Sequence, residues 1–202
     1  MKKILITGFD PFGGESTNPA LAAVMALPDK IGDLVVIKRE LPTVFGKSID
    51  LLYNFLDSEA PDAVICVGQA GGRPNITVER VAINCNDSSM PDNAGNAPAD
   101  QPIEPAGAAA YFATLPIKLI VDKLREGGIP AGISNSAGTY VCNQIMYGAL
   151  HYAATHRPGM AAGFVHIPYL PSQVIDKPAA PSMPLDMLVL ALQIIIKASA
   201  GM

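Results

Sequence analysis

Short apolar runs alternate with amphipathic stretches along most of the chain. The apolar runs, rich in valine and isoleucine, predict strands at residues 3–7, 33–41, 62–68, 80–84, 131–135 and 162–167. Stretches with apolar side chains three or four positions apart predict helices at residues 18–27, 44–59, 116–128, 140–156 and 185–199. The alternation predicts an α/β fold, a three-layer α/β/α sandwich around a mostly parallel central sheet.

Two segments interrupt this alternation. Residues 86–110 and 168–184 are rich in Pro, Ala, Asn and Asp. Loops this long in a compact domain are usually functional or interface elements. The first segment could close a pocket or form a subunit interface, and the sequence does not choose between these two roles.

Composition narrows the class of protein. A chain of 202 residues fits one domain spanning 1–202, and 50% hydrophobic with 16% charged residues favours a packed core. The net charge of -4 argues against a nucleic-acid partner. The apolar runs near the two ends are too short for a signal peptide or a membrane span. We therefore expect a soluble, cytoplasmic protein.

The cysteines are Cys66, Cys85 and Cys142, widely spaced and without a CxxC pair. This spacing predicts neither a disulfide framework nor a metal site. Cys66 lies inside an apolar run and Cys85 just after one, so both are expected to be structural thiols.

Residues that follow the strands are the candidate site, because ligands of open α/β sheets bind beyond the carboxyl ends of the strands. The stretch GFDPFGG (8–14) follows the first strand and lacks the glycine spacing of a phosphate-binding loop. Phe9 and Phe12 favour an apolar, uncharged ligand group held between rings. A tight turn whose aromatic side chains cap the core would give the same pattern.

Cys142 lies where the helix over 140–156 is expected to begin. With Thr139 as N-cap, the thiol lies beside free backbone N–H groups and the positive end of the helix dipole. Both favour a thiolate with a lowered pKa, and the N–H groups could hold an oxyanion. A buried structural thiol is the alternative.

A thiolate that attacks an acyl group needs a base. His151 and His156 lie about two to four turns along the helix that begins near Cys142, too far to reach the thiol. His166 ends a strand and is the remaining candidate, although a histidine packed in the core would look the same. The group that orients the imidazole could be any of four carboxylates: Glu79, Asp10, Asp87 or Asp92.

Six motifs occur in order along the chain: GFDPFGG (8–14), VGQAGGR (67–73), ERVAIN (79–84), PDN (91–93), AGTYVCN (137–143) and FVHIP (164–168). Together they resemble the pyroglutamyl peptidase I (pyrrolidone-carboxylate peptidase) family, from Ile4 to about Leu192. The resemblance implies a cytoplasmic cysteine exopeptidase that removes N-terminal pyroglutamyl residues from peptides. It also implies a phosphorylase/hydrolase-like fold, no cofactor and a homotetramer.

The resemblance implies a role for individual residues. Cys142 would be the nucleophile, His166 the general base and acid, and Glu79 the third member of the triad. The positions near the lactam ring of the substrate would be Phe9, Phe12, Asn18, Gln69, Met90, Tyr140 and Val141.

Several positions depart from the pattern of the family, among them Val78, which replaces Pro beside Glu79 and is expected to loosen that turn. Ser89 replaces an arginine that helps to hold the oxyanion, which leaves more to the backbone N–H of Cys142. Tyr140 replaces Phe and adds a hydroxyl that needs a partner, whereas Met90 replaces Ile and keeps an apolar wall. Two other hypotheses stay open: a non-catalytic nucleotide- or phosphate-binding module that uses GFDPFGG as its cradle, and an inactive relative.

Overall fold

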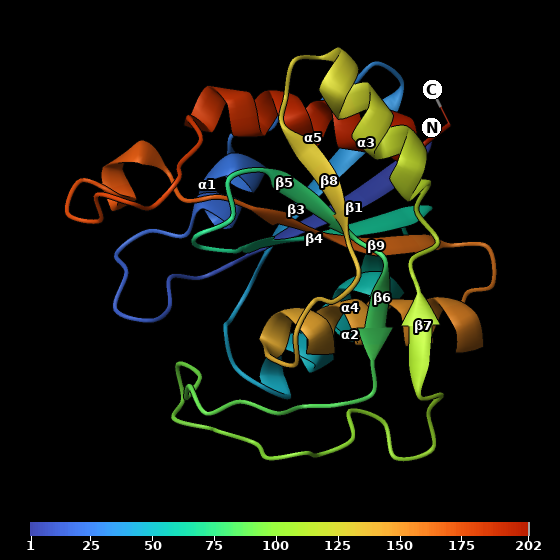
Figure 1. The fold of residues 1–202 in the computed structure, drawn as a ribbon. Helices are drawn as coiled ribbons and strands as arrows, with labels where there is room; N and C mark the ends of the chain where they lie inside the picture. The colour runs from blue at the N-terminus through green and yellow to red at the C-terminus, as the bar shows by residue number, and fades with distance from the viewer. Residues whose placement is uncertain (202) are drawn as a thin grey trace.

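A seven-stranded sheet forms the centre of the fold, in the order β2-β3-β1-β4-β9-β5-β8 (Figure 1). The computed structural model describes residues 1–201. The strands are β1 Lys3–Phe9, β2 Lys30–Ile31, β3 Leu34–Leu41, β4 Ala63–Gln69, β5 Ile76–Glu79, β8 Ala131–Ser134 and β9 Ala161–Ile167. Within this sheet, as described over residues 1–201, only the β2–β3 and β5–β9 pairs are antiparallel, which confirms the prediction of a mostly parallel sheet.

Helices cover both faces of the sheet, as the alternation of elements predicts (Figure 1). One face carries α1 (Pro19–Met25), α3 (Ile117–Glu126) and α5 (Leu185–Ser199), and the other carries α2 (Lys47–Glu59) and α4 (Val141–Thr155). Successive side chains of a strand point to opposite faces, so Ile4 and Ile6 join the first core and Leu5 joins the second. Both layers of helices thus rest on strands that are apolar on each side.

The ends of several helices follow the signals in the sequence. Asn18 caps α1, since its Oδ1 accepts a hydrogen bond from Ala20 N at 2.9 Å. Gly127 ends α3, and Gly128 follows it with a φ of 74°. The expected cap on α4 is wrong: the N-cap is Tyr140, and the Thr139 hydroxyl instead donates to Asp87 O at 2.6 Å.

The strands β2, β5 and β7 lie where the sequence predicts no strand, and β6 does not join the main sheet. The stretch predicted as one strand at 80–84 forms β6 (Val81–Ile83), which pairs with β7 (Ala110–Phe112) outside the main sheet. β5 lies in the segment expected as a loop after β4. β5 and β8 run antiparallel to β9, so their carboxyl ends do not share the edge formed by β1, β4 and β9. The residues that follow β8 nevertheless return to that edge, since Ala137, Tyr140 and Cys142 line the same cavity as His166.

The segment over 168–184 contains a short 3₁₀ helix, η1 (Pro171–Gln173). It lies against the chain that links β1 and α1, because the Gln173 side chain donates to Thr17 O at 3.2 Å. Among residues 1–201, no helix combines the length and the hydropathy that crossing a bilayer requires.

Candidate active site

A cavity of about 320 Å³ lies at the carboxyl ends of β4 and β9. Six predicted site residues line it: Phe12, Gln69, Met90, Tyr140, Cys142 and His166. Four further residues line it that the sequence did not single out: Gly71, Ser88, Ala137 and Tyr169. The thiol and the imidazole therefore share one cavity, as the elimination of the other histidines predicts.

The first turn of α4 positions Cys142. The next residue, Asn143, is buried, and its amide holds the backbone of β6, accepting from Ile83 N at 3.0 Å and donating to Ile83 O at 2.9 Å. Gln144 accepts from Gly46 N at 3.0 Å and donates to Asn86 Oδ1 at 3.3 Å. These amides fix the start of the helix to two neighbouring segments, and the thiol with it.

Gly68 makes room for the thiol on the sheet side. A methyl group at this position would lie 2.7 Å from Phe164 Cζ and 3.1 Å from Cys142 Sγ. Both distances are shorter than carbon and sulfur atoms tolerate, so glycine lets the strand, the aromatic ring and the nucleophile approach one another.

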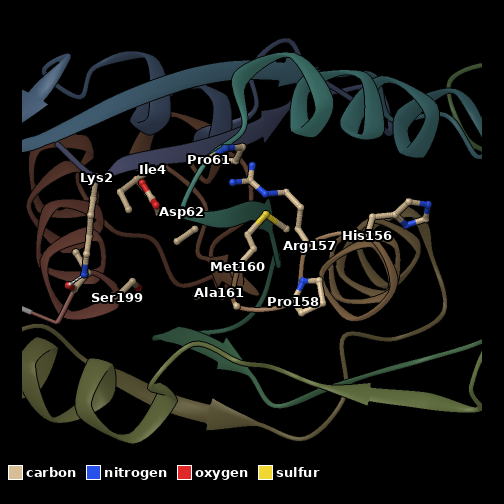
Figure 2. A pocket seen from close by; sticks show the side chains of 13 residues that line it. Lys2, Ile4, Pro61, Asp62, His156, Arg157, Pro158, Met160, Ala161 and Ser199 are labelled. Carbon is tan, nitrogen blue, oxygen red and sulfur yellow. Dashed lines mark hydrogen bonds between the residues drawn. The ribbon is translucent and has the colours of Figure 1, made fainter.

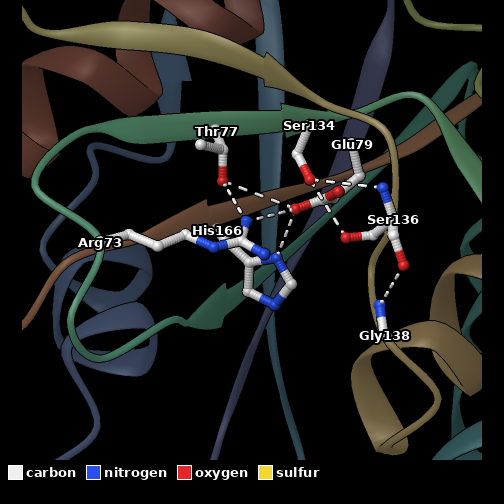
Figure 3. Close-up of polar contacts among 7 residues, drawn as sticks. All are labelled: Arg73, Thr77, Glu79, Ser134, Ser136, Gly138 and His166. Carbon is white, nitrogen blue, oxygen red and sulfur yellow. Dashed lines mark hydrogen bonds and ion pairs between the residues drawn. The ribbon is translucent and has the colours of Figure 1, made fainter.

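Glu79 and His166 meet through the register of two antiparallel strands. Thr77 on β5 pairs with His166 on β9, and Glu79 lies two residues further along the same face. The Glu79 Oε1 atom is 2.7 Å from His166 Nδ1, and Glu79 is completely buried (Figure 3). Of the four candidate carboxylates, Glu79 is the one that the fold brings to the imidazole.

Arg73 is a partner of Glu79 that the sequence analysis missed. Its Nη1 lies 2.8 Å from Glu79 Oε1 and 2.6 Å from Thr77 Oγ1 (Figure 3). The neighbouring Arg80 points elsewhere and donates to Asn135 Oδ1 at 2.7 Å. Glu79, which is completely buried, therefore forms no surface ion pair with the residue that follows it in the sequence.

The other candidate carboxylates hold the backbone. Asp10 accepts from Thr43 N at 2.6 Å, and Asp92 accepts from Phe45 N at 2.8 Å. Asp87 is exposed and lies 3.4 Å from Asp100 N. None of them lines the cavity in the described part of the chain.

Burial and hydrogen bonds together set the charges of Glu79 and His166. Burial acts to raise the pKa of the Glu79 carboxyl, but hydrogen bonds from His166, Ser134 and Arg73 outweigh it and lower the pKa. Burial lowers the pKa of the His166 imidazole below 6.5, although Glu79 opposes this shift. At neutral pH the imidazole is thus uncharged, donates from Nδ1 to the Glu79 carboxylate and keeps Nε2 free to accept a proton.

The expected thiolate with a lowered pKa is not what the structure shows. Burial raises the pKa of the Cys142 thiol to about 12, and the negative charge of Glu79 adds to the shift. The Arg73 cation and a hydrogen bond from the Cys142 backbone act to lower the pKa but are too weak to reverse the shift. The resting thiol is therefore protonated, and the attack requires the removal of its proton.

A family model described as pyroglutamyl peptidase matches residues 2–201. The pyrrolidone-carboxylate peptidase of Alkaliphilus oremlandii is 54% identical over 98% of this chain and 92% of its own length. The chain belongs to the pyroglutamyl peptidase family, a family of cysteine peptidases. The pyrrolidone-carboxylate peptidase of Treponema denticola is 52% identical over 97% of this chain and 92% of its own length.

Solved structures of the pyroglutamyl peptidase family have the same fold. The crystal structure of pyroglutamyl peptidase I from Bacillus amyloliquefaciens matches with a TM-score of 0.95 and 45% identity, covering 100% of this chain and 98% of that one. A mutant pyrrolidone carboxyl peptidase from Pyrococcus furiosus matches with a TM-score of 0.96 and 46% identity, covering 98% of each chain. The order and pairing of strands described above therefore belong to a known enzyme architecture.

Three residues that the resemblance places near the lactam ring do not line the cavity of this pyroglutamyl peptidase family member. Phe9 is 2% exposed and packs against Phe164, with 6.3 Å between ring centroids. Both ends of the Asn18 amide are already hydrogen-bonded: Oδ1 accepts from Ala20 N at the start of α1, and Nδ2 donates to Asp10 O at 3.0 Å. Val141 is completely buried under the first turn of α4. Of the two interpretations of GFDPFGG, Phe9 follows the one in which an aromatic side chain packs in the core, whereas Phe12 lines the cavity.

The structure shows what surrounds Tyr140 and Ser89, two positions at which the sequence departs from the family pattern. The Tyr140 hydroxyl donates to Pro91 O at 3.2 Å, so the added group fastens the wall that carries Met90. Ser89 is exposed and does not line the cavity. The N–H groups of the first turn of α4 have no partners within the helix, since Gln144 N is the first to reach back, to Tyr140 O at 3.2 Å. They remain available to an oxyanion.

The other thiols of this family member lie outside the cavity. Cys66 is buried on β4, and burial raises its pKa to about 12. Cys85 Sγ lies 3.7 Å from Asp100 Oδ1. Among the described residues, Cys142 is therefore the one cysteine with access to the cavity.

A larger cavity, of about 660 Å³, lies at the opposite end of the sheet (Figure 2). Lys2, Asp62, His156 and Arg157 line it, beside the first residues of β4 and β9. His156 thus lies far from the thiol, and His151 is held by Tyr111, with 3.1 Å between Nδ1 and the hydroxyl. Neither histidine lines the cavity that contains Cys142.

Proposed function

We propose that this chain hydrolyses the bond after an N-terminal pyroglutamyl residue of a peptide, with Cys142 as nucleophile, His166 as base and acid, and Glu79 as the group that orients the imidazole. The observation that carries the proposal is the shared cavity of Cys142 and His166, backed by the 2.7 Å contact between His166 and the buried Glu79. Membership of the pyroglutamyl peptidase family supports the choice of substrate.

The proton balance of the reaction follows from the resting charges. His166 Nε2 takes the proton of the Cys142 thiol as the sulfur attacks the acyl carbonyl, and Glu79 stabilises the imidazolium that forms. The imidazolium then gives this proton to the leaving amine. In the second half, His166 removes a proton from the water that attacks the thioester and returns it to the Cys142 sulfur as the C–S bond breaks, which releases pyroglutamate and restores the resting state. The N–H groups of the first turn of α4, which have no partner within the helix, are the donors that we assign to the oxyanion.

The lining of the cavity suits an uncharged ring. Among the described residues, no Asp, Glu, Lys or Arg side chain lines it. A free α-amino group would lose its water there without gaining a carboxylate, which is costly. A lactam carries no charge, and the rings of Phe12 and Tyr140, 6.3 Å apart between centroids, offer it apolar walls.

The phosphate cradle is less well supported than the peptidase. Asp10, in the middle of GFDPFGG, points its carboxylate at Thr43 N and Asn93 Nδ2, so the loop presents a negative charge. A phosphate would be repelled by this charge, and no lysine or arginine lines the neighbouring cavity in residues 1–201.

The direct test is the release of a fluorophore from a pyroglutamyl amide by the purified protein. We expect release by the wild type, its loss in Cys142→Ala, and unchanged activity in the matched Cys85→Ala variant. Because His166 must be uncharged to accept the proton, activity should fall on acidification with a midpoint below 6.5. No release by the wild type refutes the function, and activity that survives in Cys142→Ala refutes the nucleophile.

We also propose that residues 1–202 act as one catalytic domain and that the protein assembles as a homotetramer in the cytoplasm, as the resemblance to the family implies. Light scattering coupled to size-exclusion chromatography should give four times the mass of 21.1 kDa. A monomer mass at the concentration of the assay would contradict the assembly without affecting the chemistry.

A further inference from the structure

Gln69 lines the cavity, and the Gln173 side chain on η1 contacts it from outside. We propose that Gln173 is a positioning residue that fixes which end of the Gln69 amide faces the substrate, so that the cavity presents N–H donors to a ring carbonyl. This inference rests on the proposed function and names the group by which the cavity recognises a lactam.

The orientation of the Gln173 amide is set by its own backbone environment. Leu170 N lies 2.9 Å from Gln173 Oε1. A backbone N–H can only donate, so the atom facing it must be the amide oxygen. The Gln173 Nε2 group therefore points the other way, toward the chain between β1 and α1 and toward the end of β4.

Three oxygens surround that Nε2 group. They are Gln69 Oε1 at 3.1 Å, Thr17 O at 3.2 Å and Glu15 Oε2 at 3.4 Å. Thr17 O and the Glu15 carboxylate are acceptors under any assignment, so the group among them must be a donor. The contacting atom of Gln69 is therefore its oxygen, because an N–H group in that place would face a donor and find no acceptor.

With its oxygen turned toward Gln173, Gln69 offers its Nε2 donors to the cavity. No hydrogen bond among residues 1–201 uses them. A pyroglutamyl ring carries a carbonyl oxygen that needs a donor once water is displaced. A saturated ring without the carbonyl would leave the Gln69 donors unpaired, and sites built on such hydrogen bonds reject analogues that lack the partner.

The segment that carries Gln173 is held firmly enough for this role. Lys177 forms an ion pair with Glu15, and its Nζ lies 4.6 Å from the centroid of the Tyr169 ring. Tyr169 in turn packs against Gly71, where a methyl group would come within 2.2 Å of the ring. Contacts on both sides of Gln173 therefore hold the segment over 168–177 in place: Tyr169 packs against Gly71, and Lys177 pairs with Glu15.

The test replaces Gln173 by Glu, which keeps an oxygen for Leu170 N but removes the donor. The Gln69 amide should turn to donate to the new carboxylate and present its oxygen to the cavity. For a fluorogenic pyroglutamyl amide we expect kcat/KM to fall about tenfold or more, mainly through KM. The matching cyclopentanecarbonyl amide, which lacks the lactam, should be turned over at an unchanged rate.

Matched variants separate positioning from damage to the fold. Gln193→Glu adds the same charge on α5 and should change nothing. Gln173→Met removes the donor without a charge and should show a smaller loss of the same preference. In a Gln69→Met background, Gln173→Glu should change KM less than about twofold. Alkylation of Cys142 by iodoacetamide should proceed at the wild-type rate in Gln173→Glu.

Two results would overturn the inference: an unchanged preference for the lactam over the cyclopentane ring in Gln173→Glu and Gln173→Met, or an equal loss that persists in the Gln69→Met background. If the wild type releases no pyroglutamyl group, the proposed function fails on its own. The preference is then read as the ratio of dissociation constants of the two amides on Cys142→Ala protein, with and without Gln173→Glu.

Discussion

The floor of the cavity and its rim are built by different means. The floor is formed by His166 on β9, with Glu79 on β5 behind it, and both are buried and held in register by the backbone of the sheet. The rim consists of the segments over 8–17, 86–96 and 168–177, which are held by side-chain hydrogen bonds from single carboxylates and amides.

The difference assigns separate tasks to the two regions. Catalytic groups must keep their mutual geometry within a few tenths of an ångström, which neighbouring strands provide without further side chains. A wall that shapes a ligand tolerates more movement, and loops provide it. Changes on the floor should therefore lower kcat, whereas changes on the rim should raise KM or lower stability.

Glu79→Gln should have the largest effect. The amide cannot stabilise the imidazolium and favours the wrong tautomer of His166, so we expect kcat to fall ~10³–10⁴-fold with little change in KM. Steady-state kinetics with the pyroglutamyl amide measure both constants. Glu126→Gln, on the surface of α3, is the matched control. If kcat/KM fell mainly because KM rose, Glu79 would shape the binding of the substrate rather than act in catalysis.

Arg73→Met should come next, with kcat lowered about tenfold. Without the guanidinium, the pKa of Glu79 rises, and so does the pKa of His166, which Arg73 lowers. Both shifts move the acid limb of the pH profile to higher pH. Arg73→Lys should restore part of the activity, and Arg80→Met should leave the profile in place. An unmoved acid limb in Arg73→Met would show that Arg73 only fills space.

Asp92→Asn tests the rim. The carboxylate accepts hydrogen bonds from Phe45 N, Ala94 N and Asn96 N, so we expect KM to rise several-fold and the free energy of unfolding to fall by about 1–3 kcal/mol, with kcat nearly kept.

The loss of stability in Asp92→Asn should depend on pH. Burial acts to raise the pKa of Asp92, but hydrogen bonds, first those of Asn96, lower it below 3.8. A depressed carboxyl pKa contributes stability above the unfolded value and loses it as the pH falls through the folded value. The difference in Tm between wild type and variant should be full at neutral pH and shrink below about pH 4. A constant difference across this range would contradict an ionised Asp92.

Tyr140→Phe should have the smallest effect. It removes one hydrogen bond, to Pro91 O, and keeps the ring that faces Phe12 and Phe45. We expect a change of about 1 kcal/mol or less in stability, at most a threefold rise in KM, and an unchanged kcat. A large fall in kcat would mean that the Tyr140 hydroxyl takes part in catalysis, which contradicts its assignment to the rim.

Much of the fold could be predicted from local patterns of apolar and polar residues in the sequence. The alternation of apolar runs and amphipathic stretches predicts the three layers, and Asn18 and Gly127 mark helix ends where the structure has them. Cys142 and His166 could be paired from sequence because only three histidines exist and two lie along α4. The ordered motifs added Glu79, which the residues alone did not select.

What local patterns missed depends on contacts between distant segments. β5 is short and becomes a strand only because β8 and β9 flank it, and its direction decides that Glu79 reaches His166. Thr139 was expected to cap α4, but the carbonyl of Asp87 takes its hydroxyl. The pKa of Cys142 was misjudged because burial, which a sequence does not display, outweighs the charges and hydrogen bonds that lower this pKa.

The formation of a pyroglutamyl thioester on Cys142 can be tested directly. An activated aryl ester of pyroglutamate should acylate the enzyme faster than water releases the acyl group, so the intermediate can be trapped by acid and located by peptide mass spectrometry. We expect one pyroglutamyl group on the peptide that contains Cys142, and none in His166→Ala. An adduct on Cys85 or Cys66, or turnover of the ester with no adduct on Cys142, would contradict this expectation.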